Sequence, residues 1–206
     1  MALYDVFSKF YDASVERLYV EHRELAALAL DAAAGHKVLD VPCGTGQSFA
    51  HLVPGKVGGA LIGVDSSAGM LKRAEARVEQ ESWAGVHLLQ RSATALSADD
   101  LQGLCPVDRL HIFLGMSVFD VMDGTFDHLW SLLAPGGRCV VVDVHAERPG
   151  LQGKLVNLIA GADIRRRFWE PLERVCADFE LRDLPHHPKH GGQIMLASGR
   201  KPLARM

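Results

Sequence analysis

The residues best suited to chemistry lie in one short segment, from Lys37 to Gln47, which reads Lys-Val-Leu-Asp-Val-Pro-Cys-Gly-Thr-Gly-Gln. An apolar run ends there in an acid, Asp40, and passes directly into a Gly-x-Gly turn formed by Gly44 and Gly46. Glycines accept positive φ and let a backbone approach a ligand, and the helix that follows such a turn presents unpaired N–H groups to a carboxylate. Because the charge of Asp40 suits an ammonium group, the segment predicts a ligand that carries both charged groups of an amino acid.

A second acid, Asp65, ends the next apolar run, about 20 residues after the glycines, where an acid accepts hydrogen bonds from the two hydroxyls of a ribose. The ligand is therefore expected to contain a nucleoside, and S-adenosylmethionine meets both requirements. A nicotinamide dinucleotide is the alternative. It is disfavoured because Phe49 replaces the third glycine of the dinucleotide fingerprint, where a large side chain obstructs close packing of helix against strand.

Three motifs resemble those of class I S-adenosylmethionine-dependent methyltransferases, with the quinone-biosynthesis type as the nearest group. They are Val38-Leu-Asp-Val-Pro-Cys-Gly-Thr-Gly46, Gly63-Val-Asp-Ser-Ser-Ala-Gly-Met-Leu71 and Leu132-Leu-Ala-Pro-Gly-Gly-Arg138. The resemblance covers about residues 1–200, and three motifs at matching intervals are more specific than one Gly-x-Gly. It implies an α/β fold: a Rossmann-like, doubly wound and mostly parallel sheet of about seven strands, with an antiparallel last strand and N-terminal helices.

The same resemblance implies a binding residue for each part of S-adenosylmethionine. The methionine part is expected at Asp40 and the glycine loop, the ribose at Asp65, and the adenine beside Ser66 and Met70. Tyr4 and Tyr11 are expected to close over the cofactor, with Tyr4 also on the substrate side. The predicted cofactor-binding residues are Tyr11, Asp40, Pro42, Cys43, Gly44, Thr45, Gly46, Asp65, Ser66, Met70, Ser92 and Ala93.

One departure from the family pattern follows the third apolar run. The family usually has Gly-Asp-Ala there, with the acid near the adenine amino group, whereas this chain has Arg91, Ser92 and Ala93. Ser92 can accept the same hydrogen bond, but more weakly. Because of this departure, one alternative is that the protein is not an enzyme but a module that binds S-adenosylmethionine without catalysing a reaction.

Methyl transfer needs mainly a nucleophile held in line with the methyl group and shielded from water, so no catalytic triad is expected. A general base helps only if the nucleophile arrives protonated, and the candidates near strand ends are His111, Asp143 and His145. We select His145, which lies just past the fifth apolar run, as the predicted catalytic base. A loop histidine without a catalytic role is the alternative, and His111, inside a predicted strand, is expected to be structural.

No metal site is predicted. His186, His187 and His190 lie close together, but in a predicted turn without an acid or thiolate to complete a site, so we expect a solvated loop. The four cysteines are widely separated and are expected to be reduced thiols, mostly buried.

Apolar runs bounded by Gly, Pro and Asp alternate with helical patterns, which is typical of βαβ units on a mostly parallel sheet. A capping-box spacing from Ser97 to Asp100 predicts a short helix before the fourth strand. The predicted strands are Val38–Val41, Ala60–Val64, Val86–Leu89, Leu110–Leu114 and Cys139–Val144. The predicted helices are Thr45–Val53, Ala68–Glu81 and Asp123–Ala134, the last ended by Pro-Gly-Gly.

The two ends of the chain differ from this alternation. Phe179–Leu184 and Ile194–Ala197 read as two strands of a hairpin at the edge of the sheet. Residues 3–34 have helical spacing and predict two helices over the carboxyl ends of the strands. We expect a single domain over residues 1–206, with residues 1–34 as a helical cap and 151–178 as a substrate lid.

Composition limits the partners. A net charge of −3 argues against a broad nucleic-acid footprint, and no apolar run approaches the roughly 20 residues that span a bilayer. Without a signal-like start, the expected compartment is the cytoplasm, with peripheral contact at the inner membrane surface as one possibility. The oligomeric state stays open.

The segment before the hairpin is the one that suggests a substrate. Leu151–Ile159 has an apolar helical face and precedes three consecutive arginines beside aromatic residues, a pattern that suits a phosphate headgroup at a membrane surface. The tail resembles small bacterial phospholipid N-methyltransferases that act on phosphatidylethanolamine. The predicted substrate-binding residues are Tyr4, Arg165, Arg166 and Trp169.

Two alternatives stay open at this point. In the first, the acceptor is a quinone or another apolar metabolite, which is methylated on carbon or oxygen. In the second, the segment is structural: Leu155, Val156, Leu158 and Ile159 pack on the sheet, and Arg165–Arg167 form a solvated face.

Overall fold

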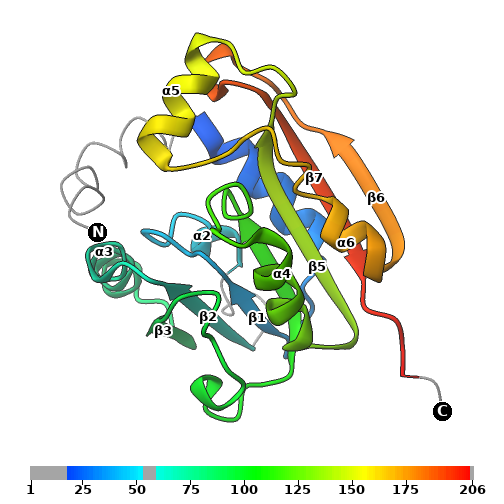
Figure 1. Ribbon diagram of the computed structural model, residues 1–206. Helices are drawn as coiled ribbons and strands as arrows, with labels where there is room; N and C mark the ends of the chain where they lie inside the picture. The colour runs from blue at the N-terminus through cyan, green and yellow to red at the C-terminus, as the bar shows by residue number, and fades with distance from the viewer. Residues whose placement is uncertain (1–17, 53–58, 205–206) are drawn as a thin grey trace.

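The structure is a computed structural model that describes residues 18–52 and 59–204. Seven strands in these residues form one sheet in the order β3-β2-β1-β4-β5-β7-β6 (Figure 1). Neighbouring strands are parallel except in the two pairs that contain β7. The predicted Rossmann-like sheet with an antiparallel last strand is therefore confirmed. The strands are β1 (Lys37–Asp40), β2 (Ala60–Asp65), β3 (Val86–Gln90), β4 (Val107–Phe113), β5 (Leu133–His145), β6 (Ala177–Asp183) and β7 (Gln193–Arg200).

Helices cover both faces of the sheet (Figure 1). None of the helices in the described part of the chain has both the length and the apolar character needed to cross a membrane. The residues at 18–30 form a helix, called the N-terminal helix below. The others are α2 (Phe49–Leu52), α3 (Ala68–Gln80), α4 (Met122–Ser131), α5 (Leu151–Ala160) and α6 (Glu170–Val175), with single 3-10 turns η2 (Asp99–Leu101) and η3 (Pro188–His190).

Alternation along the central strands produces two apolar layers. Val140 and Val142 of β5 belong to one buried cluster with residues of the N-terminal helix, α2 and α3. Val141, between them, belongs to the other, with Phe126 of α4 and Leu172 of α6. Because successive side chains of a strand point to opposite faces, a run of valines in β5 supplies both layers.

The switch in strand order fixes the place of the site. β1 pairs with β2 on one side and with β4 on the other, so the chain crosses over in opposite directions from β1. Ligands of doubly wound sheets bind outside the carboxyl ends of the strands at such a point. The residues that follow β1, β2 and β4 are therefore the ones that the fold brings together.

Two predicted helices differ in extent. The helix predicted to run to Ala134 ends at Ser131, and Leu133 already begins β5. The Pro-Gly-Gly sequence is thus not a helix stop but part of β5, where the Gly136 N–H donates to the carbonyl of Lys201 (2.8 Å). The helix predicted at residues 45–53 is shorter in the structure, where only α2 (Phe49–Leu52) is helical. Residues 43–48 form turns after β1 instead.

The short helix predicted from the capping-box spacing is present as η2. The Ser97 Oγ accepts the Asp100 N–H (3.2 Å), and the Asp100 carboxylate accepts the Ser97 N–H (2.9 Å). The predicted terminal hairpin is also confirmed, since β6 and β7 pair antiparallel. Of the two helices predicted before β1, only the second lies among the described residues.

The N-terminal helix is anchored by the loop between β6 and β7. The Tyr19 ring stacks on His190 with centroids 4.9 Å apart, and the His22 Nε2 donates to the carbonyl of Pro185 (2.6 Å). His190 is 1% exposed, so the expectation of a fully solvated loop was wrong for this residue. Burial lowers the pKa of His190 to about 4. The anchored helix brings its side chains to the carboxyl ends of the strands.

Candidate active site

A cavity of about 670 Å³ opens at the carboxyl ends of β1, β2, β4 and β5. Its volume lies in the range of small-molecule sites, which is roughly 300–1,000 Å³. Its walls come from the turns after these strands, from the N-terminal helix and from α5 with the residues after it. The cavity therefore lies at the switch point that the fold predicts.

The glycine turn forms one wall. Gly44 has φ +56° and lines the cavity, and a Cβ placed on it would meet nothing within 4 Å. The open space beside the Gly44 Cα lets a ligand approach the backbone. Gly46 has φ +74° but does not line the cavity, and a Cβ there would lie 2.7 Å from the Phe49 ring. Its role is thus to let Phe49 pack beneath the turn. The predicted neighbours Pro42, Cys43 and Thr45 line the cavity.

Asp65 ties this turn to the end of β2. One carboxylate oxygen accepts the Gly44 N–H and the other accepts the Ser67 N–H, both at 2.9 Å. Each oxygen keeps a further lone pair for a ligand hydroxyl. Burial raises the pKa of Asp65, an effect that the backbone hydrogen bonds oppose. Asp65 lines the cavity, so a ribose diol fits this position.

Asp40 lies beneath the cavity rather than on its wall. It is 1% exposed, and its Oδ1 is 2.7 Å from the Nδ1 of His111 on β4. The Asp40 Oδ2 and the His111 Nε2 are buried without a hydrogen-bond partner among the described residues. The charge of Asp40 still acts on the site, since it contributes to the raised pKa of Cys43 and of Asp65. Direct contact with a ligand ammonium, as predicted from the sequence, is not supported by this geometry.

The N-terminal helix supplies two wall residues that the sequence analysis missed, Tyr19 and Arg23. The Arg23 guanidinium donates to the Gln47 amide oxygen and lies 4.8 Å from the centroid of the Phe113 ring. It is 7% exposed, so a cation is held next to the glycine turn. Arg23 could have been identified from the sequence, because it is a polar residue four positions after Tyr19 on the buried face of an amphipathic helix.

The wall at the ends of β2 and β3 contains the residues predicted to surround the adenine. Ser66, Met70, Ser92 and Ala93 all line the cavity. The Ser92 Oγ is 2.7 Å from the Thr94 Oγ, so this serine already has a partner in the loop. The structure therefore brings together the glycine turn, Asp65 and the four predicted adenine neighbours.

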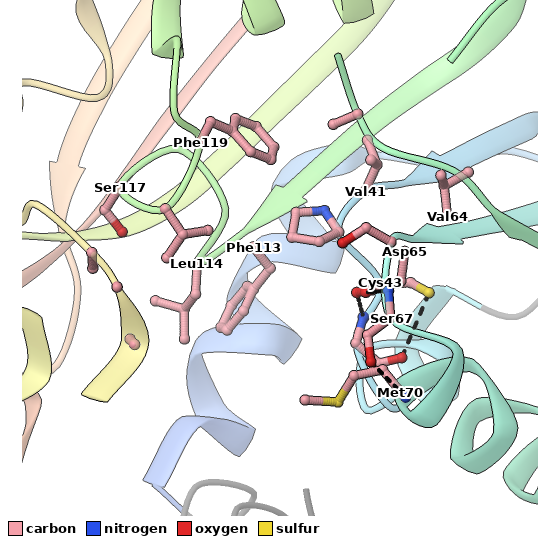
Figure 2. A pocket seen from close by; sticks show the side chains of 18 of the residues that line it. Val41, Cys43, Val64, Asp65, Ser67, Met70, Phe113, Leu114, Ser117 and Phe119 are labelled. Carbon is pink, nitrogen blue, oxygen red and sulfur yellow. Dashed lines mark hydrogen bonds between the residues drawn. The ribbon is translucent and has the colours of Figure 1, made fainter. Parts of the chain in front are cut away.

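The opposite half of the cavity, called the acceptor half below, is lined mainly by apolar residues. Figure 2 shows Leu114, Ser117 and Phe119 facing Asp65 across the cavity, with Phe113 between them. Of the described residues that line this half, the charged ones are Asp120 and Asp143. The full lining is Leu114, Ser117, Val118, Phe119, Asp120, Asp143, Val144, Val156, Ala160, Gly161, Ala162 and Ile164.

Asp143 holds the loop after β4 in place. Its carboxylate accepts the Ser117 N–H (2.8 Å), the Ser117 hydroxyl (2.9 Å) and the Val144 N–H (2.8 Å). The residue is fully buried, and burial raises its pKa to about 6. Asp120 belongs to the same loop but is exposed, at the rim of the acceptor half.

Among the described residues, the predicted catalytic residue His145 and the predicted substrate-binding residues Arg165, Arg166 and Trp169 do not line the cavity. The His145 Nδ1 is 3.1 Å from the carbonyl oxygen of Arg166, and its ring packs edge-on against Trp169. Trp169 itself is buried in the apolar layer beside α6. Arg165 pairs with Asp163 at 2.8 Å, and Arg166 donates to the carbonyl of Phe119. Tyr4 and Tyr11 lie outside the described residues.

Comparison with known proteins adds a sequence and a structural likeness. Residues 39–139 match the model of a methyltransferase domain. The chain is 31% identical over 147 residues to demethylmenaquinone methyltransferase of Clavibacter sepedonicus, which is 69% of this chain and 56% of that protein. It is 34% identical over 122 residues to methyltransferase GfsG of Streptomyces halstedii, which is 56% of this chain and 40% of that protein. The chain thus spans about half the length of these curated relatives.

Among solved structures, the N-methyltransferase NodS from Bradyrhizobium japonicum WM9 has a similar fold. The TM-score is 0.69 at 17% sequence identity, and the match covers 93% of this chain and 99% of that one.

Proposed function

Since the chain carries a methyltransferase domain of the class I, S-adenosylmethionine-dependent type, we propose that it methylates the amine of a phospholipid ethanolamine headgroup. The observation that carries the proposal is the cavity at the switch point, which combines a nucleoside-type wall with an acceptor half whose charged lining residues are carboxylates. When bound, S-adenosylmethionine supplies an electrophilic methyl group on a sulfonium. The residues of this chain bind both reactants, align them and exclude water.

The cofactor fits the first half of the cavity residue by residue. Arg23 suits the methionine carboxylate, because a guanidinium forms strong hydrogen bonds with a carboxylate in a buried site. Gly44 leaves open space for the ligand, and Asp65 keeps acceptor capacity for the ribose hydroxyls. Ser66 and Met70 flank the adenine, with Ser92 and Ala93 on the same wall. Asp40 acts only through its charge, from beneath this wall.

The acceptor half favours an amine. Carboxylates attract an ammonium group, whereas the apolar wall formed by Leu114, Val156 and Ile164 disfavours its charged form. An amine that has lost its proton is the nucleophile. Asp120, exposed at the rim, is the group that we propose to accept this proton in place of His145, whose ring is held by Arg166 and Trp169. Asp143 positions the loop that carries Asp120.

The rest of a phospholipid would stay outside the cavity. Arg165 directly follows Ile164, which lines the cavity, and its side chain is 64% exposed. A phosphate at the cavity mouth would compete with Asp163 for this guanidinium. We therefore propose that Arg165 binds the phosphate of the lipid headgroup. Arg166 supports the lid by its hydrogen bond to the carbonyl of Phe119, and Trp169 supports it by packing against the ring of His145.

The second candidate is methylation of a quinone or another apolar metabolite on carbon or oxygen. Two observations favour it: the similarity to a demethylmenaquinone methyltransferase and the mainly apolar lining of the acceptor half. An apolar ring needs no cationic partner in the cavity. The two candidates differ in whether Asp120 interacts with a cationic acceptor.

The test is transfer of a labelled methyl group to acceptors in detergent micelles. Phosphatidylethanolamine, phosphatidylcholine and a reduced naphthoquinone are supplied separately. We expect label in phosphatidylethanolamine only. We also expect Asp120→Asn to lower kcat at least about tenfold without changing the affinity for S-adenosylmethionine, while Asp127→Asn, on the exposed side of α4, leaves kcat unchanged.

Three other outcomes would contradict the proposed acceptor, the catalytic activity or the role of Asp120. Label in the naphthoquinone alone would replace the proposal by the second candidate. Cofactor binding without turnover of any acceptor would favour a binding module. Full activity of Asp120→Asn on phosphatidylethanolamine would remove this residue from the reaction.

A further inference from the structure

The outer face of α5 exposes large apolar side chains. Leu151 is 89% exposed and Leu158 79%, and Leu155 and Ile159 are 46% and 43% exposed. The spacing i, i+4, i+7 and i+8 places these four on one side of the helix. They form what we call the α5 stripe. The alternative expectation that this side packs on the sheet was therefore wrong for Leu155, Leu158 and Ile159.

The inner face of α5 fixes this orientation. A Cβ on Gly153 would lie 2.6 Å from the carbonyl oxygen of Gly191, so the helix sits in close contact with the loop after η3. Val156, also on the inner side, lines the cavity. Since the helix cannot rotate without losing the Gly153 contact, the stripe stays exposed while the other side of the same helix closes the acceptor half.

Charge around the α5 stripe is mainly positive, although the whole chain carries a net charge of −3. Lys154 is exposed three residues after Leu151 and four before Leu158, so it lies within the stripe. Lys189 is close by, because its carbonyl accepts a hydrogen bond from the side chain of Gln152. Arg148 is exposed just before the helix. The nearby acids are Glu147 and Asp163, and Asp163 is paired with Arg165.

We propose that α5 is a docking surface for an anionic lipid bilayer, with the α5 stripe inserted at the level of the headgroups. The helix has 10 residues, about half of what spans a bilayer, so it would lie in the plane of the surface. Lys154, Lys189 and Arg148 would contact lipid phosphates. A lysine lies readily beside apolar side chains at such a surface, because its long stem stays with them while its ammonium reaches the phosphates.

A second copy of the chain suits this face less well. In a two-fold symmetric contact through the α5 stripe, Lys154 of each copy would be brought close to the same residue of the other. Such a contact would bury like charges, whereas an anionic surface neutralises them. Docking also has a consequence for the proposed function: α5, whose inner side closes the acceptor half, would lie on the membrane in which a lipid acceptor resides.

The experiment measures binding of the full chain to vesicles by co-flotation, without cofactor and without any ethanolamine lipid. Vesicles of phosphatidylcholine mixed with phosphatidylglycerol are compared with vesicles of phosphatidylcholine alone. We expect binding to the anionic vesicles, weakened by high salt. We expect the double variant Leu151→Gln and Leu158→Gln to lower the partition coefficient at least about tenfold, because each leucine contributes apolar burial at the interface.

The matched control is Leu28→Gln, since Leu28 is 70% exposed on the N-terminal helix. It should bind as the unchanged chain does, and Lys154→Glu should lose binding to the anionic vesicles. Absence of binding to anionic vesicles, or unchanged binding of the double variant, would overturn the proposal. So would light scattering that shows a dimer which the double variant converts to a monomer. Because no methyl transfer is measured, failure here is distinct from failure of the proposed function.

Discussion

Asp65 shows how one side chain can serve both the fold and a ligand. Its two oxygens hold the Gly44 and Ser67 N–H groups, so the carboxylate keeps the glycine turn at a fixed position relative to the end of β2. A backbone N–H needs an acceptor, and both carboxylate oxygens are acceptors at neutral pH. An amide side chain of the same shape cannot supply two acceptors.

Asp65→Asn should therefore disturb the turn and the ribose position together. The amide nitrogen would face one of the two N–H groups, which leaves that donor without a partner. We expect the affinity for S-adenosylmethionine to fall about ten- to a hundredfold, measured by calorimetric titration. Asp183→Asn, an exposed position on β6, makes the same charge change and should leave the affinity unchanged. Binding within twofold of the unchanged chain would show that Asp65 is not part of the site.

Asp143 predicts a pH dependence of stability. Burial raises its pKa to about 6 in the folded chain, whereas an aspartate in the unfolded chain has the ordinary value of 3.8. The folded state therefore binds the proton more tightly than the unfolded state. The contribution of this group to the free energy of unfolding therefore falls as pH rises from about 4 to about 6, by about 2 kcal/mol. Urea unfolding at the two ends of this range measures it.

The variant Asp143→Asn isolates this contribution. Asparagine does not titrate, so the difference between the unchanged chain and the variant should vary with pH in this range. The variant should also be less stable than the unchanged chain at every pH, because the Ser117 N–H or hydroxyl loses its acceptor. A difference that stays constant from pH 4 to pH 6 would mean that the pKa of Asp143 is not raised by burial.

At the scale of elements, the N-terminal helix depends on a loop more than 150 residues later in the chain. Tyr19 and His22 contact His190 and Pro185, and Arg23 on the same helix lines the cavity. His190→Gln should remove the aromatic stack and loosen the helix. We expect faster amide hydrogen exchange in residues 18–30, with no change in β1 and β4, while His186→Gln, exposed in the same loop, leaves the helix unchanged. Unaltered exchange in residues 18–30 of His190→Gln would show that the helix is anchored elsewhere.

Local patterns predicted most elements but not all their ends. The capping box from Ser97 to Asp100 and the hairpin of β6 and β7 were identified because short-range chemistry determines them. The end of α4 was misplaced, because Pro-Gly-Gly usually stops a helix. In the folded chain, pairing of β5 with β4 and the contact of Gly136 with Lys201 extend the strand through these residues.

In the molecule as a whole, the order of motifs was enough to predict the seven-stranded sheet, and most of the described residues predicted to bind the cofactor line the cavity. What could not be predicted depends on contacts between distant segments. Asp40 was expected on the cavity wall, but its register opposite His111 in β4 pairs the two side chains beneath it. Arg23 was missed because its place in the cavity follows from the packing of the N-terminal helix. The exposure of the α5 stripe follows from the contact of Gly153 with Gly191.

We propose that the cavity beside Gly44 binds S-adenosylmethionine. Gly44 and Gly103 form a matched pair for testing it. Both have positive φ, +56° and +85°, and in both a Cβ would meet nothing within 4 Å, but only Gly44 lines the cavity. Substitution by alanine strains the backbone at either position, at a cost of about 1 kcal/mol or more.

Calorimetric titration with S-adenosylmethionine of the unchanged chain, Gly44→Ala and Gly103→Ala is the most direct test. We predict a Kd on the order of micromolar for the unchanged chain, a loss of at least about tenfold in Gly44→Ala, and an unchanged Kd in Gly103→Ala despite its lower stability. No heat of binding in the unchanged chain, or equal affinity of the two variants, would contradict the assignment of this cavity.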